Sequence, residues 1–513
     1  MCARRQWGYW LFGIVSFLLG DRTARADDSV PTWGMFSQDH DIGNPAIAGS
    51  STYDPAKQSY SLSAGGKNMW AERDEFHLLA LPISGDFIVR ASVQFVGAGV
   101  DPHRKFGIIA RDSTSAGSRY ADAAVHGDGL TSLQFRAAED GPTAQVKHTV
   151  LAPTEIEFRR VGNTFTFSAA QWGDELQPVR QELDLQAEVL VGLYVCSHRV
   201  DVKEQAIFHN VRVEIPAPAD LVPYRQYIGS RLETMNVATG ERKILKEFPG
   251  SIQAPNWTTD NQSLIYNAEG LLYRYSLRDG SVAKLNTGLA DKNNNDHVLS
   301  FDGQQLAISS ASGTSRNSTI FVLPVSGSDQ LQKITDETKG AADMHGWSPD
   351  GQTLVYTGVR DKVGNIYAID LKTGQERRLT DQPALDDGPE YSPNGQFIYF
   401  NSARSGTMQI WRMQPDGGHP EQMTKGERQD WFPHLSPDGQ QLVFISFAPE
   451  VGSTDHPFYQ HVSLHIMPSN GGPRKTIATL YGGQGTINVP SWSPDGTHIA
   501  FVSNSVLPLA QKK

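Results

Sequence analysis

The stretch Trp347-Ser348-Pro349-Asp350-Gly351 decides the fold, because it recurs throughout the second half of the chain. Proline presets φ, and Asp-Gly accepts a positive φ, so each copy makes a tight chain reversal. The six copies lie 42 to 57 residues apart. The other five, two of them degenerate, are Tyr391-Ser392-Pro393-Asn394-Gly395, Leu435-Ser436-Pro437-Asp438-Gly439, Trp492-Ser493-Pro494-Asp495-Gly496, Trp257-Thr258-Thr259-Asp260-Asn261 and Leu299-Ser300-Phe301-Asp302-Gly303.

Each repeat predicts four short strands, such as an alternating strand at 353–356 after the turn and a polar outer strand at 376–380. A period in the low forties with four strands per unit is typical of a β-propeller. The last copy stops after its second strand, at 499–503, and the region opens with two unpaired strands, at 232–237 and 241–245. We therefore expect the first two strands to complete the last of six blades and close the ring.

The first half of the chain, residues 33–214, alternates apolar and polar residues between Gly-rich turns, as at 87–93 and 164–168. This pattern predicts an antiparallel sandwich with one face of each sheet buried. The Pro-rich segment 215–223 is typical of a linker. The predicted fold is thus all-β, a sandwich over 27–217 followed by a six-bladed propeller over 218–513.

The first 26 residues are expected to be a secretory signal. Arg4 and Arg5 precede an apolar run at 10–20, and Ala24-Arg25-Ala26 supplies a small-x-small cleavage site. The apolar run is shorter than the roughly 18–20 residues that span a membrane. We expect a cleaved signal, export, and no membrane span in the mature protein.

Charge and cysteine content exclude several classes of function. The chain has 45 Lys and Arg against 56 Asp and Glu, a net charge of −11. Nucleic-acid binding requires a basic surface, so we expect no nucleic-acid partner. Beyond the predicted signal the only cysteine is Cys196, which excludes an internal disulfide framework and a Cys-x-x-Cys zinc site.

The repeated turn, the strand Ile366-Tyr367-Ala368-Ile369-Asp370 and the Leu379-Thr380 ending resemble the TolB-type propellers, which are exported and built from WD40-like repeats. Phrases such as Gly107–Asp112 and Phe208–Val213 resemble concanavalin A-like jelly-roll modules of bacterial secreted carbohydrate-active proteins. These resemblances imply a bacterial periplasmic or secreted protein. The second also implies a glycan-facing surface on the sandwich, with these candidates: Trp70, Arg111, Tyr120 and His198.

The residues just before each turn are expected to line one mouth of the propeller, because the innermost strands begin there. His297 and His345 occupy the same position in adjacent blades, and connecting loops add further polar side chains to this mouth. Long loops over the mouth of a scaffold are commonly functional. The candidate binding residues are His297, His345, Asp387, Glu390, Arg404, Trp431, His434, His456, His461 and Asn488.

This cluster leaves several chemistries open. His297, His345 and His434 could hold a divalent metal as cofactor, since neutral imidazoles are ordinary ligands. Alternatively, the histidines and Glu390 could run acid–base chemistry while Arg404 holds a carboxylate and Trp431 stacks on a sugar. In a purely structural interpretation, the same side chains make hydrogen bonds between blades.

The sequence supports three functional hypotheses and does not decide whether the protein is an enzyme. The first is an exported, monomeric binding protein that engages a glycan or a cell-envelope protein at the propeller mouth. The alternative is a carbohydrate-active enzyme, a metal-assisted polysaccharide lyase or a glycoside hydrolase, that uses the same mouth. The third is a structural scaffold in an envelope complex.

Overall fold

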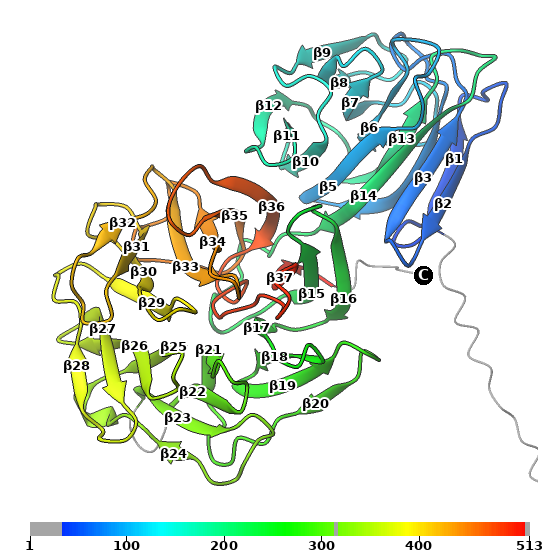
Figure 1. The fold of residues 1–513 in the computed structure, drawn as a ribbon. Coiled ribbons are helices and arrows are strands. Elements are labelled where there is room, and N and C mark those ends of the chain that lie inside the picture. Colours follow the sequence, from blue (N-terminus) through cyan, green and yellow to red (C-terminus); the bar gives the residue numbers. More distant parts are fainter. Residues whose placement is uncertain (1–32, 312–315, 508–513) are drawn as a thin grey trace, which may run out of the picture.

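The computed structural model describes residues 33–311 and 316–507, so the predicted signal at 1–26 lies outside the described residues. Almost all of the regular structure is β, with one short 3₁₀ helix at Glu337–Lys339. Figure 1 shows a sandwich formed by the first half of the chain beside a ring of blades formed by the second half. Within the described ranges, no helix has the length and apolar character required to cross a membrane.

The sandwich consists of two seven-stranded sheets in which every pairing is antiparallel. The first sheet has the order β1 (Gln38–Ile42), β4 (Phe76–Ser84), β13 (Glu188–Cys196), β6 (Lys105–Arg111), β7 (Tyr120–His126), β8 (Thr131–Arg136), β9 (Thr143–Lys147). The second has the order β12 (Gln177–Glu182), β11 (Thr164–Ala170), β10 (Glu155–Val161), β5 (Phe87–Phe95), β14 (Glu204–Glu214), β3 (Ser59–Ala64), β2 (Ser50–Asp54).

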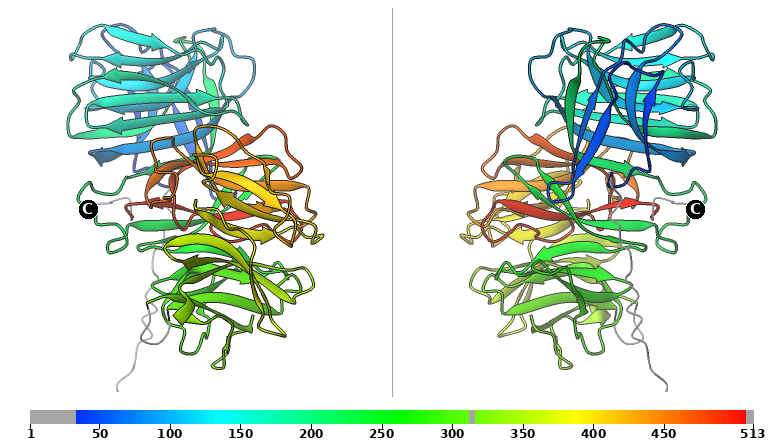
Figure 2. Two further views of the ribbon diagram at one scale, coloured as in Figure 1. Left: turned by 90° about the vertical axis from the view of Figure 1, so that its left-hand side faces the viewer. Right: turned by 90° about the vertical axis from the view of Figure 1, so that its right-hand side faces the viewer.

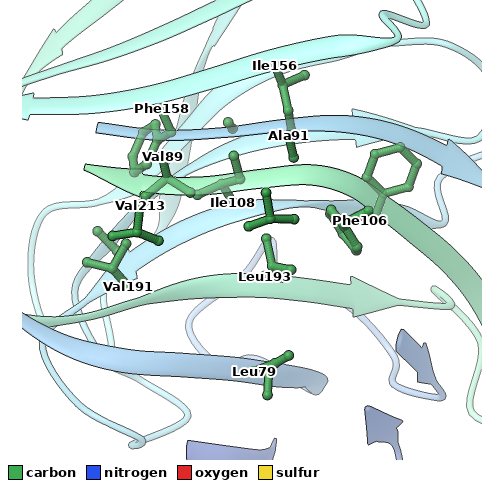
Figure 3. Close-up of a cluster of buried hydrophobic side chains, with 14 of the residues drawn as sticks. Leu79, Val89, Ala91, Phe106, Ile108, Ile156, Phe158, Val191, Leu193 and Val213 are labelled. Carbon is green, nitrogen blue, oxygen red and sulfur yellow. The ribbon is translucent and has the colours of Figure 1, made fainter. Parts of the chain in front are cut away.

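The core of the sandwich follows from the period-two pattern of its strands. Alternate residues of β5, including Val89 and Ala91, point between the sheets and meet Ile108 and Leu193 of the opposite sheet (Figure 3). Phe158 of β10 belongs to the same buried cluster. Burial of these apolar side chains is the main favourable term for packing the two layers.

Five blades of the propeller are four-stranded sheets. From the innermost strand outward, blade by blade, the strands are β17 (Gln253–Trp257), β18 (Ser263–Ala268), β19 (Leu271–Ser276), β20 (Val282–Lys284); β21 (Asn293–Leu299), β22 (Gln305–Ala311), β23 (Ser318–Pro324), β24 (Gln332–Lys333); β25 (Ala342–Trp347), β26 (Thr353–Arg360), β27 (Val363–Asp370), β28 (Glu376–Arg378); β29 (Asp386–Tyr391), β30 (Ile398–Ser402), β31 (Gln409–Met413), β32 (Glu421–Gln422); β33 (Gln429–Leu435), β34 (Gln441–Phe447), β35 (Gln460–Pro468), β36 (Lys475–Gly482).

The sixth blade joins the two ends of the propeller, as the sequence predicted. Strand β37 (His498–Ser505) pairs along its whole length with β15 (Gly229–Asn236), which in turn pairs with β16 (Arg242–Phe248). The six-bladed ring is therefore confirmed. The innermost segment of this blade forms no regular strand in the described residues: it has an isolated bridge between Trp492 and Ile499, and the carbonyl of Ser491 accepts from the N–H of Ala500 at 2.9 Å. Pro490, which lacks a backbone donor, precedes that bridge and limits regular pairing there.

The recurring turn has one geometry, seen clearly between β25 and β26. The Ser348 hydroxyl donates to Asp350 Oδ1 over 2.5 Å and accepts from the backbone N–H of Thr353 at 2.9 Å. Gly351 has φ of 69°, in the left-handed region that favours glycine. The Ser-x-Asp-Gly pattern therefore satisfies the polar groups of a reversal between adjacent strands.

The sandwich contacts the ring beside the sixth blade and the β33–β36 blade (Figures 1 and 2). Arg212 of β14 donates to Glu233 of β15 over 2.8 Å, and Arg242 of β16 binds the same carboxylate at 3.0 Å. His461 of β35 pairs with Glu157 of β10 at 2.6 Å. The two halves thus share buried charged groups, and the predicted boundary at 217/218 falls between β14 and β15.

Candidate functional site

β-Bulges in the innermost strands position the side chains at the propeller axis. In β29 the register shifts between Asp387 and Glu390, where Gly388 has φ of 62°. In β33 it shifts between Trp431 and His434, where Phe432 has φ of 53°. Because a bulge re-aims the residues on either side of it, one strand can direct polar groups toward both ends of the axis.

Three aspartates and a histidine gather where the innermost strands begin. His345 Nε2 lies 3.4 Å from Asp387 Oδ1, which also accepts from the Thr357 hydroxyl at 2.6 Å. Asp343 accepts from Asn294 of the neighbouring blade at 2.9 Å. Asp296 lies close enough to His345 to interact with it electrostatically. Among the described residues, no lysine or arginine forms an ion pair with these three aspartates.

The loop that joins β34 to β35 completes the cluster. His456 Nδ1 donates to Gln484 Oε1 over 2.5 Å, and Asn488 donates to the same oxygen at 3.1 Å. The ring of Phe432 lies between His345 and His456, with centroid distances of 6.3 Å and 5.3 Å. We call this cluster the polar mouth, and its members are Asp296, Asp343, His345, Asp387, His456 and Asn488.

Burial and neighbouring charges shift the pKa values of the polar mouth in different directions. Burial raises the pKa of Asp296 to about 8, against the pull of His345, and the carboxylates of Asp343 and Asp387 add to the rise. Burial disfavours a charged imidazole, but Asp296 and Asp387 outweigh it and raise the pKa of His345 to about 9. The hydrogen bond and charge of His345 overcome burial and lower the pKa of Asp387. Burial also raises the pKa of Asp343. Near neutral pH, Asp296, Asp343 and His345 therefore share protons within the polar mouth, while Asp387 is ionised.

Glu390 and His434 pair with each other further along the axis. His434 Nδ1 donates to Glu390 Oε2 over 2.7 Å, and Nε2 donates to the carbonyl of Ile487 at 2.7 Å. The other oxygen of Glu390 accepts from the backbone N–H of Leu435 at 3.0 Å. These contacts link three successive blades.

The remaining four predicted residues lie outside the polar mouth. His297 is buried and its Nε2 donates to the carbonyl of Ile265 at 3.2 Å. Arg404 pairs with Asp386 at 2.8 Å and packs over the Trp411 ring. Trp431 is fully buried, and its ring packs edge-on against that of His456, with the centroids 4.5 Å apart. His461 belongs to the junction with the sandwich.

The three histidines predicted as metal ligands are each engaged with a different partner. His297 contacts a backbone carbonyl, His345 contacts Asp387 and His434 contacts Glu390. Over residues 33–311 and 316–507, no group of three or more His, Cys, Asp or Glu is arranged to hold a metal ion. The divalent-metal hypothesis therefore stays a prediction without a geometric counterpart in the described part of the chain.

The opposite end of the axis carries an aromatic mouth that the sequence reasoning missed. It is a cavity of about 370 Å³ with Glu390 in its lining. The sequence could have indicated this cavity, because six of its lining residues directly precede the six recurring turns. They are Trp257, Leu299, Trp347, Tyr391, Leu435 and Trp492. The indoles of Trp347 and Trp492 donate to carbonyl groups of the preceding blade, at 2.9 Å and 3.0 Å, so these side chains also join blades.

The sandwich candidates divide into two groups. Arg111 and Tyr120 are fully buried, and the Tyr120 hydroxyl donates to the carbonyl of Met69 at 2.7 Å. Trp70 and His198 line a cleft on the first sheet. Only the second pair is placed to meet a ligand.

Comparison with known proteins agrees with the propeller. The family described as PD40, TolB beta propeller domain, matches residues 299–453. An uncharacterized protein of Agrobacterium fabrum strain C58 is 44% identical over 275 residues, which cover 53% of this chain and 92% of that relative.

A solved structure from Agrobacterium tumefaciens gives the same result. This protein, provisionally assigned as TolB, is 42% identical and covers 55% of this chain and 100% of its own, with a TM-score of 0.52. TolB from Acinetobacter baumannii is 17% identical over 64% of this chain and 79% of its own, with a TM-score of 0.40.

The fold and its axial site define a six-bladed β-propeller protein joined to a β-sandwich. With the relative from Agrobacterium fabrum matched over nearly its whole length, the chain belongs to the TolB-type β-propeller family.

Proposed function

We propose that this chain is an exported binding protein that engages a glycan or a cell-envelope protein at the polar mouth. The observation that carries the proposal is the gathering of Asp296, His345 and Asp387 at the axis, where His345 lies 3.4 Å from Asp387 and no lysine or arginine of the described residues pairs with the aspartates. Such a set offers donors and acceptors side by side, which suits a ligand rich in hydroxyl or amide groups.

The proposal also covers the cellular location of the protein and the role of its sandwich. Export rests on the signal predicted at 1–26, and a bacterial periplasmic or secreted location agrees with membership of the TolB-type family. We further propose that residues 27–217 form a concanavalin A-like module that makes a second contact with the ligand. The two seven-stranded sheets support this proposal. The protein is proposed to act as a monomer.

A second candidate is a carbohydrate-active enzyme that uses the same mouth. The specific observation is the opposite displacement of two carboxyl pKa values, with Asp296 raised and Asp387 lowered. Pairs of titratable groups whose environments separate their pKa values are typical of acid–base catalysis in glycosidases. In this version Asp296 is the acid and Asp387 is the base.

The binding proposal is tested by titration calorimetry of the mature protein against acidic and neutral oligosaccharides, together with cross-linking in envelope extracts of a related bacterium. We expect Asp387→Asn and His345→Gln to weaken binding at least tenfold, which corresponds to the loss of about one charge-assisted hydrogen bond. Asp361→Asn, on an exposed turn between β26 and β27, is the matched control and should bind like the wild type.

Equal binding by all of these variants would refute the polar mouth as the site. The enzyme candidate is tested on the same oligosaccharides by assaying unsaturated and reducing-end products. If it holds, Asp296→Asn lowers kcat by about 10²- to 10⁴-fold, the usual contribution of a general acid. Binding without product would leave the first function standing and remove the second.

A further inference from the structure

The sandwich carries a cleft of about 240 Å³, remote from both propeller mouths. Its floor comes from three adjacent strands of the first sheet, through Lys105 of β6, His126 of β7 and Gln134 of β8. Trp70, His103 and His198 contribute to its lining from connecting loops. No described residue of the propeller lines this cleft.

The period-two pattern of the strands explains why polar groups face the cleft. Phe106, Val125 and Leu133 point into the apolar core between the sheets. Their neighbours in sequence, Lys105 and His126 among them, must therefore point to the other face. That face is covered by surrounding loops, so the polar groups are buried rather than solvated.

Lys105 is the first unusual group. It is 2% exposed, and within the described residues its one hydrogen bond to a side chain goes from Nζ to Gln134 Oε1 at 3.3 Å. In the same residues, no carboxylate oxygen lies within 4.0 Å of its ammonium group. Burial lowers the pKa of Lys105, because no close counter-charge offsets it. An ammonium group has three donors, so the contact with Gln134 leaves two unused. A buried cation without a partner is costly unless a ligand supplies the opposite charge.

His126 is the second unusual group. The amide nitrogen of Gln134 lies 3.1 Å from His126 Nε2, and it also donates to Ser132 Oγ at 3.2 Å. His126 Nε2 must therefore accept, and the ring proton sits on Nδ1. Nδ1 is buried and has no hydrogen-bond partner. Burial, reinforced by the charge of Lys105, lowers the pKa of His126 to about 3, so the ring is a neutral donor.

The charge of the cleft is opposite to that of the molecule. The lining contains one lysine and three histidines and no aspartate or glutamate, whereas the whole chain carries −11. Carboxylates outside the lining contact its histidines: Asp101 is 3.4 Å from His198, and Asp128 is 4.0 Å from His103. Asp122 and Asp74 act on Lys105 from within the sheet. Burial raises the pKa of Asp122 to about 7, and Asp74 is paired with Arg136, so both are weak counter-charges to Lys105.

We propose that this cleft binds a small ring-bearing ligand through an oxyanion, either a carboxylate or a phosphate. Lys105 supplies the charged donor for the oxyanion, and His126, whose Nδ1–H has no partner in the described residues, lies in the lining of the same cleft. Trp70, which is 39% exposed at the cleft, supplies a flat apolar face for the ring. The proposal is independent of the function proposed for the polar mouth.

The test is titration calorimetry of the full chain with glucuronate, glucose 6-phosphate, inorganic phosphate and glucose. We expect at least one of the two ring-bearing anions to bind and glucose not to bind. The preferred anion identifies which oxyanion the cleft takes. Lys105→Met should weaken binding at least tenfold, and Trp70→Ala should weaken ring-bearing anions more than inorganic phosphate. The control Lys284→Met, on the exposed strand β20, should change nothing.

The proposal is overturned if the wild type binds neither ring-bearing anion, or if glucose binds as tightly as they do. Thermal melting of each variant checks that it is folded. If Lys105→Met does not fold, the exposed Trp70→Ala variant still decides, because unchanged affinity for the ring-bearing anions would contradict the site. Asp387→Asn should bind these anions normally, so a failure at the polar mouth and a failure at this cleft are distinguishable.

Discussion

At the scale of single residues, equivalent positions of the repeat carry side chains with different charge states. His297 and His345 occupy matching places in adjacent blades. Burial lowers the pKa of His297 to about 4, whereas neighbouring aspartates raise the pKa of His345 to about 9. The repeat fixes where the ring of each histidine lies, whereas burial and the aspartates of its own and adjacent blades fix its charge. Of the two, only His345 is therefore charged at neutral pH.

The polar mouth predicts how stability depends on pH. Asp296 and His345 both have pKa values raised in the folded protein, so the folded state retains protons that the unfolded chain releases. The stabilisation from His345 is complete below pH 6.5 and is lost as pH rises through about 9, and that from Asp296 declines up to about pH 8. The free energy of unfolding should therefore fall between pH 6 and pH 9.

The variant Asp296→Asn tests this dependence by urea unfolding at pH 6 and pH 9. It removes one titrating group and one of the charges that raise the pKa of His345, so the difference between the two pH values should shrink. Asp387 has a lowered pKa and acts only in acid, outside this range. The exposed Asp361→Asn is the control, and a pH difference as large in Asp296→Asn as in the wild type would contradict the assignment.

Arg404 shows that a charged residue near the axis need not face a ligand. It pairs with buried Asp386 and packs over Trp411, so Arg404→Gln should leave ligand affinity unchanged while lowering stability. The expected loss is about 3–5 kcal/mol, because the Asp386 carboxylate is left buried without its partner. Urea unfolding measures this loss. If Arg404→Gln had normal stability and weakened ligand binding, Arg404 would contact the ligand and would not stabilise the fold.

The sequence predicted several residues of the polar mouth, but it did not predict which side chains they contact. Four of the ten candidates, His345, Asp387, His456 and Asn488, come together in the polar mouth. The burial of Trp431 beneath His456 could not be predicted from the pattern, because it depends on the loop between β34 and β35. Asp296 was passed over because its role depends on charges in other blades.

At the scale of the elements, the recurring turn is the unit that joins the two innermost strands of a blade. In the fifth copy, Ser436 donates to Asp438 Oδ1 over 2.5 Å and accepts from the N–H of Gln441 at 2.9 Å. Ser436→Ala removes both hydrogen bonds and leaves a backbone donor without its partner, so stability should fall by about 1–2 kcal/mol. Urea unfolding measures the change.

The matched control for this turn is Ser405→Ala, in the loop between β30 and β31. That hydroxyl is exposed and donates to the carbonyl of Thr407 at 3.2 Å. Its removal should change stability by less than about 0.5 kcal/mol, as for ordinary surface positions. Equal losses of stability in the two variants would mean that the hydrogen bonds of the turn stabilise the protein no more than an exposed hydroxyl does.

Pattern and spacing were sufficient for the propeller because turn chemistry is local. The Pro-Asp-Gly sequence fixes the reversal, and the period then fixes the number of blades. The incomplete inner segment of the sixth blade was not predicted, since it depends on how Pro490 and the nearby glycines meet the neighbouring strand. The sandwich was predicted only as a class, because alternation does not reveal the order of its strands.

At the scale of the whole molecule, a buried carboxylate joins the sandwich to the ring. Burial opposes the ionisation of Glu233, but Arg212 and Arg242 outweigh it and hold its pKa well below the usual range. Glu233→Gln leaves two buried guanidinium groups without a counter-charge. We expect a loss of about 3–5 kcal/mol in the free energy of unfolding.

The control for this junction is Asp201→Asn. Asp201 pairs with Arg199 at 3.1 Å, and the two side chains are 61% and 46% exposed. An exposed pair of this kind should contribute little to stability. If Glu233→Gln were no more damaging than Asp201→Asn, as measured by urea unfolding, the junction would not depend on the buried charges.

Closure of the ring by β15 and β37 has a consequence for biosynthesis. The sandwich and the first strands of the sixth blade are translated early, whereas β37 is among the last residues of the ring to be made. Until then β15 presents an unpaired edge, which is a hazard for aggregation. Arg212 of the finished sandwich already reaches Glu233 of that strand. The sandwich can therefore hold β15 in place while the rest of the ring is translated, and it acts as a folding template within the same polypeptide.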